Sequence, residues 1–348
     1  MKALCKTKPE PGVTYCEVPK PVCGPKEVLV QVKAVGICGS DVHIYEWTPN
    51  YEHTIPYMPY IMGHEYSGVI VEVGSEVTER KVGDRVVCRP FSECGHCHYC
   101  KSGQRFYCLN GKTPRGLCRD GAYAEYCAMG EDEVVPMPDS MSYELGALVE
   151  PGIVTCSGVI DSRIQFGDFC VIQGPGPIGL MTLLFAKAYG AGRCVVVGTK
   201  RDKLRMELAK ELGADYVIYG DEVNVVEEVQ KLTGGYGADI VFECTGVPAM
   251  VQVGLDSVVR SGKVVLVGIY PRNGEINLTT TVRNAKQIIG TYSDGIAWEK
   301  LIDWMGSDNH YAKAMTKLIT HRSRLEDADA AFHRCINKEN CKEMFIFD

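Results

Sequence analysis

The segment Gly174-Pro-Gly-Pro-Ile-Gly179 places the strongest constraint on what this chain can fold into. It follows an apolar run over residues 169–173 and opens a helical pattern that begins at Leu180. Glycines at this spacing permit a tight turn, let the backbone approach a pyrophosphate, and place the phosphates at a helix N-terminus. The segment therefore predicts a strand, a turn and a helix that bind a dinucleotide.

Strand-like and helical runs continue to alternate after this turn. The strand-like runs cover 194–197, 216–219, 240–243 and 263–269, and helical patterns cover 180–190, 202–212, 223–232 and 249–259. Such alternation predicts parallel βαβ units in a doubly wound sheet. Residues 1–150 instead carry short alternating runs between glycines and prolines, which predict antiparallel strands. The expected fold is therefore α/β, with a β-rich domain and a doubly wound parallel-sheet domain.

The residues after the second strand of this pattern bear on the choice of cofactor. An NAD site usually places an acid there, about 20 residues beyond the glycines, whereas this chain has Gly198 followed by two cations. An acid would repel a 2′-phosphate, and cations accept one, so the pattern favours NADP over NAD. The nearby Asp202 is the argument for NAD. The candidate cofactor-binding residues are Gly174, Gly176, Pro177, Ile178, Gly179, Gly198, Thr199, Lys200 and Arg201.

Length and charge exclude several classes of protein. A chain of 348 residues is long enough for two domains. Its 37 basic and 44 acidic residues give a net charge of −7, which argues against nucleic acid as the main partner. No apolar run reaches the roughly 20 residues that span a bilayer. The first residues lack the apolar region of a signal peptide, so we expect a cytoplasmic protein without a membrane partner.

Cysteine is the one unusual component, with 17 residues. Four of them, Cys94, Cys97, Cys100 and Cys108, follow the pattern C-x2-C-x2-C-x7-C. In a reducing compartment, clustered cysteines more often hold a metal than form disulfides. The spacing predicts a zinc ion with four thiolate ligands, which is structural because its coordination shell is closed. The alternatives are a disulfide pair, reduced cysteines that cluster without a metal, and an iron–sulfur cluster.

Basic residues in and after this loop allow a different interpretation. They are Lys101, Arg105, Lys112, Arg115 and Arg119. A zinc-ribbon protein that binds nucleic acid would carry such a group. A solvated positive face or a subunit contact is favoured here, because the whole chain is acidic.

A second set of potential metal ligands is spread more widely. Cys38 follows one predicted strand, His64 and Glu65 precede another, and Glu150 stands before Pro151 at the apparent domain boundary. Thiolate, imidazole and carboxylate are all donors that zinc accepts. Three protein ligands and a water would leave an open coordination position, which is the catalytic arrangement.

Taken in order, these motifs resemble the zinc-dependent medium-chain alcohol dehydrogenase superfamily over essentially the whole chain. The nearest branches are the polyol (sorbitol-like) dehydrogenases and the threonine dehydrogenases. The resemblance rests on the segments 36–43, 63–65, 82–86, 149–151 and 174–179, together with the four-cysteine loop. Gly198 departs from the family's usual acid at this position.

The resemblance implies a GroES-like catalytic domain over 1–152 and 292–348 and a Rossmann domain over 153–291. It also implies a catalytic zinc held by Cys38, His64 and Glu65, with Glu150 as a nearby or exchanging ligand. Ser40 and His43 would relay the alcohol proton to solvent. Two zinc ions per chain, one catalytic and one structural, and a homo-oligomer, either a dimer or a tetramer, are expected.

The expected reaction is hydride transfer from a secondary alcohol or polyol to NAD(P). The alternatives are an L-threonine 3-dehydrogenase or an amino-alcohol dehydrogenase, and more distantly a zinc-ribbon nucleic-acid-binding protein on an inactive dehydrogenase fold. The partner is a small-molecule alcohol, and specificity is expected to reside in residues 45–60, which are rich in aromatic side chains.

Overall fold

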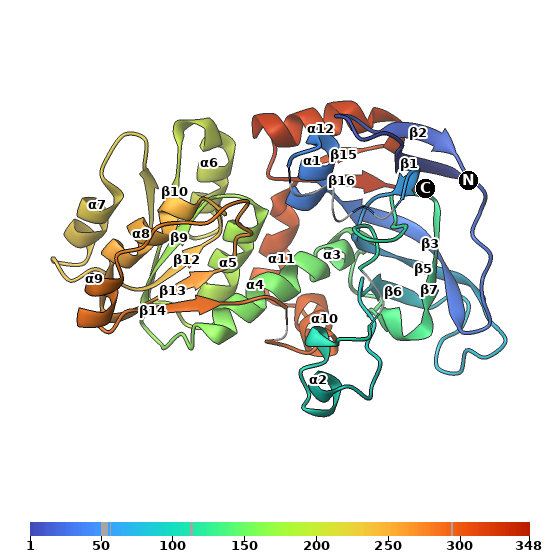
Figure 1. The fold of residues 1–348 in the computed structure, drawn as a ribbon, viewed down its shortest axis with the longest axis horizontal. Coiled ribbons are helices and arrows are strands. Elements are labelled where there is room, and N and C mark those ends of the chain that lie inside the picture. Colours follow the sequence, from blue (N-terminus) through green and yellow to red (C-terminus); the bar gives the residue numbers. More distant parts are fainter. Residues whose placement is uncertain (50–54, 56, 112–113, 294) are drawn as a thin grey trace. The chain divides into compact units, whose positions relative to one another are not determined.

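The chain forms two compact units (Figure 1). The computed structural model describes residues 1–348 except 50–54, 56, 112–113 and 294. Unit 1 consists of residues 1–150 and 297–348, and unit 2 of residues 151–296. The family resemblance implies junctions after residues 152 and 291, which lie two residues after and five residues before the junctions of these units.

The described strands of unit 1 come from both ends of the chain and pair antiparallel, except for the last two, which pair parallel to each other. Its larger sheet has the order β15-β16-β3-β5-β6-β8, with β7 also paired to β3, and its smaller sheet has the order β2-β1-β4. The strands are β1 (Lys2–Lys6), β2 (Thr14–Glu17), β3 (Glu27–Gly36), β4 (Tyr60–Ile61), β5 (Glu65–Val73), β6 (Arg85–Cys88), β7 (Tyr126–Gly130), β8 (Val134–Pro136), β15 (Ile319–Ser323) and β16 (Lys342–Ile346). Branched and aromatic side chains from these strands form the core, which includes Val30, Val32, Val35, Tyr66, Ile70 and Phe345.

Short helices connect the strands of unit 1. They are α1 (Gly39–Glu46), α2 (His98–Lys101), α3 (Tyr143–Ala147), α10 (Trp298–Gly306), α11 (His310–Met315) and α12 (Ala328–Asn337), with the 3-10 turns η2 (Arg105–Tyr107), η3 (Glu131–Glu133), η5 (Thr316–Leu318) and η6 (Leu325–Asp327). Helix α4 (Val149–Asp161) begins two residues before the junction at 150.

Unit 2 contains a six-stranded parallel sheet with the order β11-β10-β9-β12-β13-β14. Its strands are β9 (Phe169–Gln173), β10 (Arg193–Gly198), β11 (Tyr216–Tyr219), β12 (Ala238–Glu243), β13 (Val258–Leu266) and β14 (Gln287–Gly290). Its helices are α5 (Pro177–Ala188), α6 (Lys203–Glu211), α7 (Val225–Leu232), α8 (Pro248–Ser257) and α9 (Leu278–Arg283), with the 3-10 turn η4 (Lys200–Asp202). The order reverses between β9 and β12, as in a doubly wound fold. The α/β fold class is therefore confirmed.

The strand β14 was not among the predicted elements. Its four residues carry only two adjacent isoleucines, too short a run for an alternating pattern to emerge. Of the helices that the structure describes, none has both the length and the apolar character needed to cross a membrane.

Candidate metal sites and dinucleotide site

Three potential metal ligands meet where β3 ends and β5 begins. Cys38 is the N-cap of α1, two residues after β3, and His64 and Glu65 stand at the start of β5. The two strands pair antiparallel with Gly36 opposite Glu65, which brings the segments together. The ligand atoms of Cys38, His64 and Glu65 all lie within 4.8 Å of one another. This donor set fits zinc with one coordination position left open.

The buried carboxylate of Asp41 lies beside this group. The Oδ1 atom of Asp41 lies 3.7 Å from Nδ1 of His64. Its Oδ2 atom accepts hydrogen bonds from the backbone N–H of Cys38 at 2.9 Å and from the hydroxyl of Tyr123 at 2.8 Å. Burial raises the pKa of Asp41, and the neighbouring His64 opposes this rise. A carboxylate beside one ring nitrogen is the usual partner of a metal-bound histidine, which leaves Nε2 for the metal.

Lys342 completes the cluster, although the sequence did not point to it. Its ammonium forms an ion pair with Glu65 and donates a hydrogen bond to the carbonyl of Ile37 at 2.9 Å. Lys342 and Glu65 are 2% and 1% exposed as side chains, so this pair is fully buried. The contact arises because β16 pairs with β3, with Met344 opposite Gly36.

Glu150 is near this group but not within the set of mutually close ligand atoms. It lies in the first turn of α4. Burial raises its pKa to about 7. The positive charge of His64 opposes this rise, and the negative charge of Glu65 adds to it.

Ser40 and His43 lie three residues apart on α1, on one face of the helix. The Ser40 hydroxyl is shielded from solvent and has no hydrogen-bond partner among the described residues. Nδ1 of His43 lies 3.3 Å from the hydroxyl of Thr48. Burial lowers the pKa of His43. Ser40 and His43 both lie on the helix whose N-cap is the potential metal ligand Cys38.

The four cysteines of the loop converge as their spacing predicts. Sγ of Cys97 lies 3.5 Å from that of Cys100 and 3.9 Å from that of Cys108, and the Cys94 and Cys100 sulfurs are 4.0 Å apart. A tetrahedron of sulfurs with zinc–sulfur bonds of about 2.3 Å has edges of about 3.8 Å. The four sulfurs therefore fit a closed zinc site.

Backbone N–H groups help to keep two of these sulfurs ionised, whereas burial raises the pKa of Cys100 to about 12. The N–H groups of His96 and Cys97 lower the pKa of Cys94 to about 6. That of Cys100 similarly lowers the pKa of Cys97. Thiolates are the form that binds a metal. Of residues 94–108, only Cys100 is buried, so this loop has almost no apolar core of its own.

Most of the basic residues near this loop are engaged with acids. Arg115 and Arg119 both pair with the buried Glu133, and Arg105 lies 3.4 Å from Glu93. Lys112 lies outside the described residues. Guanidinium groups held in this way are poorly placed to follow a phosphate backbone, which weakens the nucleic-acid interpretation.

The glycine-rich turn adopts the geometry that a dinucleotide requires. Gly174 has φ +99°, and a Cβ on Gly179 would lie 1.8 Å from the carbonyl oxygen of Gly174. Gly176 is the N-cap of α5, and a Cβ there would meet no atom within 4 Å. Pro177 occupies the first turn and Ile178 follows it. The helix N-terminus is therefore open to an anion.

The residues after β10 form ion pairs and hydrogen bonds that could not be predicted from their charges alone. Lys200 Nζ lies 2.8 Å from Glu222, and its backbone N–H donates to Asp221 at 3.1 Å. Asp202 is buried, and its carboxylate accepts from the backbone and the hydroxyl of Thr199 at 3.0 and 2.6 Å. Arg201 is exposed. Arg201 is thus the cation of this turn with the freest side chain.

Glycine at position 198 is favoured by the limited space around it as well as by charge. A Cβ there would lie 2.6 Å from Sδ of Met206 and 2.9 Å from Cγ of Pro175. An aspartate at this position would press on the glycine-rich turn itself. Substituting Gly198 is therefore a poor test of cofactor choice.

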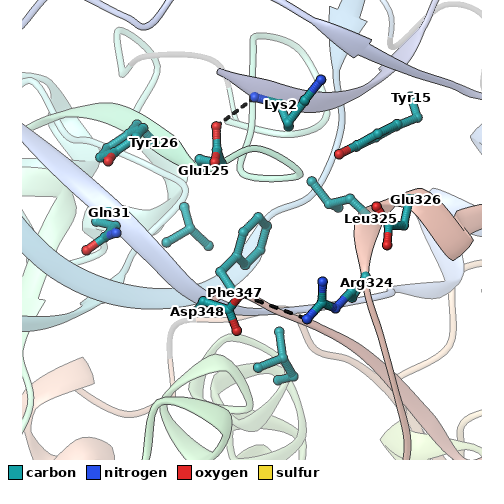
Figure 2. A pocket seen from close by; sticks show the side chains of 12 residues that line it. Lys2, Tyr15, Gln31, Glu125, Tyr126, Arg324, Leu325, Glu326, Phe347 and Asp348 are labelled. Carbon is teal, nitrogen blue, oxygen red and sulfur yellow. Dashed lines mark hydrogen bonds and ion pairs between the residues drawn. The ribbon is translucent and has the colours of Figure 1, made fainter.

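A separate cavity of about 210 Å³ lies beside the C-terminal segment of unit 1 (Figure 2). Charged groups of both signs line it, among them Lys2, Glu125, Arg324 and Asp348. It shares no residue with the metal ligands.

Of the aromatic stretch 45–60, residues 50–54 and 56 lie outside the described residues.

Two family models match the chain. Residues 24–139 match the alcohol dehydrogenase GroES-like domain, and residues 177–307 match the zinc-binding dehydrogenase domain. The sorbitol dehydrogenase of Halalkalibacterium halodurans is 35% identical over 346 residues, which cover 98% of each chain. The L-threonine 3-dehydrogenase of Rhizobium etli is 34% identical, covering 94% of this chain and 93% of that one.

Solved structures of dehydrogenases are also similar to this chain. The 2R,3R-butanediol dehydrogenase of Bacillus subtilis superposes with a TM-score of 0.88 at 31% identity, covering 100% of this chain and 99% of that one. A zinc-binding dehydrogenase of Sinorhizobium meliloti bound to NADP has a TM-score of 0.86 at 27% identity, covering 99% of each chain. An alcohol dehydrogenase of E. coli complexed with NADH has a TM-score of 0.87 at 26% identity, covering 100% and 99%.

Proposed function

Because this chain belongs to the zinc-dependent medium-chain alcohol dehydrogenase family, we propose that it oxidises a polyol or another vicinal secondary alcohol with transfer of hydride to NADP. Membership of the family and its oxidoreductase class rest on the matched domains and on the sorbitol and butanediol dehydrogenase relatives. The observation that carries the chemistry is the group of Cys38, His64 and Glu65, three ligands with one position open.

The residues around this group supply the remaining functions. When bound, zinc supplies Lewis-acid polarisation of an alcohol oxygen, and the dinucleotide supplies the hydride acceptor. Asp41 places a carboxylate 3.7 Å from Nδ1 of His64, and Cys38 caps the start of α1. The Ser40 hydroxyl accepts the alcohol proton, and the proton then reaches His43, which releases it to solvent.

A substrate panel tests the proposal. The purified enzyme would be assayed with sorbitol, 2,3-butanediol, phosphorylated polyols and L-threonine, each with NAD and NADP. The highest kcat/KM is expected with a polyol or vicinal diol. Highest efficiency with L-threonine would favour the second candidate, which the 34% identical threonine dehydrogenase supports. No reduction of either dinucleotide by any alcohol would contradict the proposed function.

Replacing His43 with asparagine is expected to lower kcat roughly 10- to 100-fold near neutral pH. Because burial depresses the pKa of His43, its imidazole is neutral at pH 7 and accepts a proton. Wild-type kcat should fall as the pH drops through this depressed pKa, and the variant should lose that limb of the profile. The exposed His310 gives a matched control, since His310→Asn should leave kcat and its pH profile unchanged. An unaltered profile in His43→Asn would remove this residue from the relay.

Replacing Arg201 with alanine is expected to reduce the preference for NADP over NAD about tenfold or more, the effect of one charge-assisted hydrogen bond to a phosphate. Lys200→Ala is the matched control, because Lys200 is already paired with Glu222 and should change the ratio far less. The measurement is kcat/KM for both cofactors at saturating alcohol. A wild type that prefers NAD, with a ratio unmoved by Arg201→Ala, would assign the enzyme to NAD.

We further propose a second, structural zinc in the four-cysteine loop, and Cys100→Ser tests it. The variant should retain one zinc per chain instead of two, as measured by elemental analysis after metal-replete expression. The melting temperature should fall by about 5 °C or more, because the loop has little other core. A chelator should remove activity before it unfolds wild type, since an open site exchanges faster than a closed one. Unchanged zinc content in Cys100→Ser would contradict the assignment.

A homo-oligomer is also proposed, formed through the edge of the unit 2 sheet. Among the described residues β14 pairs only with β13, and its Ile288 is 36% exposed. In the preceding helix α9, Leu278 and Val282 are 66% and 77% exposed. An apolar sheet edge of this kind pairs readily with a second copy of the same strand. Light scattering should give the mass of a dimer or tetramer, whereas a monomer at micromolar concentration would contradict the proposal.

A further inference from the structure

A fully buried carboxylate stands at the carboxyl end of the unit 2 sheet. Glu243 is the last residue of β12 and is 0% exposed. Its Oε1 atom accepts from the backbone N–H of Thr245 at 2.8 Å and from the Thr245 hydroxyl. Its Oε2 atom accepts from the backbone N–H of Gly246 at 3.2 Å and from the hydroxyl of Tyr270. A buried charge is costly unless hydrogen bonds compensate it, and here four donors do so.

Backbone hydrogen bonds of Glu243 and Cys244 connect the ends of three neighbouring strands, β12, β13 and β9. The carbonyl of Glu243 accepts from Val267 and Gly268, beyond β13, both at 2.9 Å. The next residue, Cys244, donates its N–H to the carbonyl of Gln173 at the end of β9 at 2.9 Å. Burial, with the carboxylate of Glu243 beside it, raises the pKa of Tyr270, which therefore stays a hydroxyl donor.

The position of Glu243 in the fold connects it with the glycine-rich turn. β12 and β9 lie on either side of the point where the strand order reverses, the place where ligands bind in open parallel sheets. A Cβ on Gly174 would lie 2.9 Å from Cγ2 of Thr245, so the segment that Glu243 holds packs against the first glycine of the turn.

A second observation points to a polar ligand at the same place. Gln173 stands directly opposite Glu243 in the β9–β12 ladder and is fully buried. Neither its side-chain nitrogen nor its side-chain oxygen has a hydrogen-bond partner among the described residues. Buried amide groups normally find partners, so this end of the sheet is built to receive a polar group.

From this arrangement we propose that Glu243 is a positioning residue for the nicotinamide half of the cofactor. It fixes the segment Thr245–Val247 and the hydroxyl of Tyr270 as a preformed surface at the switch point, beyond the glycines that receive the pyrophosphate. The inference rests on the proposed function, because it requires that the chain bind a dinucleotide.

Glu243→Gln is the direct test. An amide cannot accept at both of its terminal atoms, so at least one N–H of the held segment loses its acceptor. The full-length enzyme would be titrated by calorimetry with the dinucleotide that wild type binds more tightly. It would also be titrated with the matching ADP-ribose compound, which lacks the nicotinamide ring. The Kd of the dinucleotide should rise at least about tenfold, while the Kd of the ADP-ribose compound should change less than about twofold.

Asp239→Asn is the matched control. Asp239 is an acid in the same strand, but it stands at the amino end, where its carboxylate accepts from the N–H of Phe169 at 2.8 Å. This variant should leave the ratio of the two dissociation constants at its wild-type value even if the protein is less stable. Tyr270→Phe, which removes a single hydroxyl, should shift the same ratio in the same direction as Glu243→Gln but less.

The outcomes separate the two proposals. If Glu243→Gln raises the Kd of both compounds by the same factor, or raises neither, the positioning role is overturned. If Glu243→Gln does not fold, an unchanged ratio of the two dissociation constants in Tyr270→Phe overturns it instead. A wild type that binds the ADP-ribose compound and the dinucleotide equally well would also overturn it. A wild type that binds neither would instead overturn the proposed function.

Discussion

Cys38→Ser is expected to lower turnover by at least about a thousandfold while the fold persists. A Lewis acid contributes several kcal/mol to such a reaction, and each 1.4 kcal/mol is a factor of ten in rate. The loss should follow the metal, so elemental analysis should give one zinc ion fewer per chain. The start of α1 should survive, because Cys38 is the N-cap of that helix and serine is a preferred residue there.

Two comparisons make this expectation specific. Cys23 is also a half-buried thiol of unit 1, with its sulfur 3.0 Å from the carbonyl of Glu27, and Cys23→Ser should leave both zinc content and turnover unchanged. Binding of the dinucleotide to Cys38→Ser should persist, because the glycine-rich turn belongs to unit 2. Full activity in a Cys38→Ser enzyme with undiminished zinc would show that the open metal group is not the reaction centre.

The features that the sequence predicts are those in which spacing along the chain determines the geometry. The four cysteines lie within 15 residues, so the spacing alone indicates that their sulfurs can converge. The glycine-rich turn is likewise recognisable because its strand and helix adjoin it. The α/β class follows from the change of pattern near residue 168, which reflects two different sheet types.

The features that escape prediction depend on pairing between distant segments. Lys342 lies 305 residues beyond Ile37, and only the pairing of β16 with β3 brings it to Glu65. Its own neighbourhood in the sequence carries no metal-binding pattern. The cations after β10 show the same limit, because their charges can be counted but the pairing of Lys200 with Glu222 requires the fold. The roles of Glu243 and Gln173 arise from the β9–β12 ladder in the same way.

Lys342→Met should make the stability of the protein depend strongly on its metal. In the absence of a cation at Cys38, His64 and Glu65, the ammonium of Lys342 is what compensates the buried Glu65 carboxylate. Removing one partner of a buried ion pair costs about 3–5 kcal/mol, because the other charge remains buried. A zinc ion bound beside Glu65 would compensate that charge instead. The metal-stripped variant should therefore lose far more stability than the zinc-loaded variant.

Thermal unfolding of five proteins, each with and without zinc, measures this dependence: wild type, Lys342→Met, Glu65→Gln, the double variant of these two, and Arg322→Met. In the variant Lys342→Met/Glu65→Gln no charge is left behind, so the stripped protein should recover much of the loss, as a double-mutant cycle would reveal. Arg322→Met is the exposed comparison: Arg322 pairs with Glu144 at 2.7 Å, with side chains 47% and 28% exposed, and its loss should cost no more than about 1 kcal/mol with or without metal. Equal destabilisation of stripped and loaded Lys342→Met would mean that Lys342 supports the sheet through the carbonyl of Ile37 rather than by balancing the charge of Glu65.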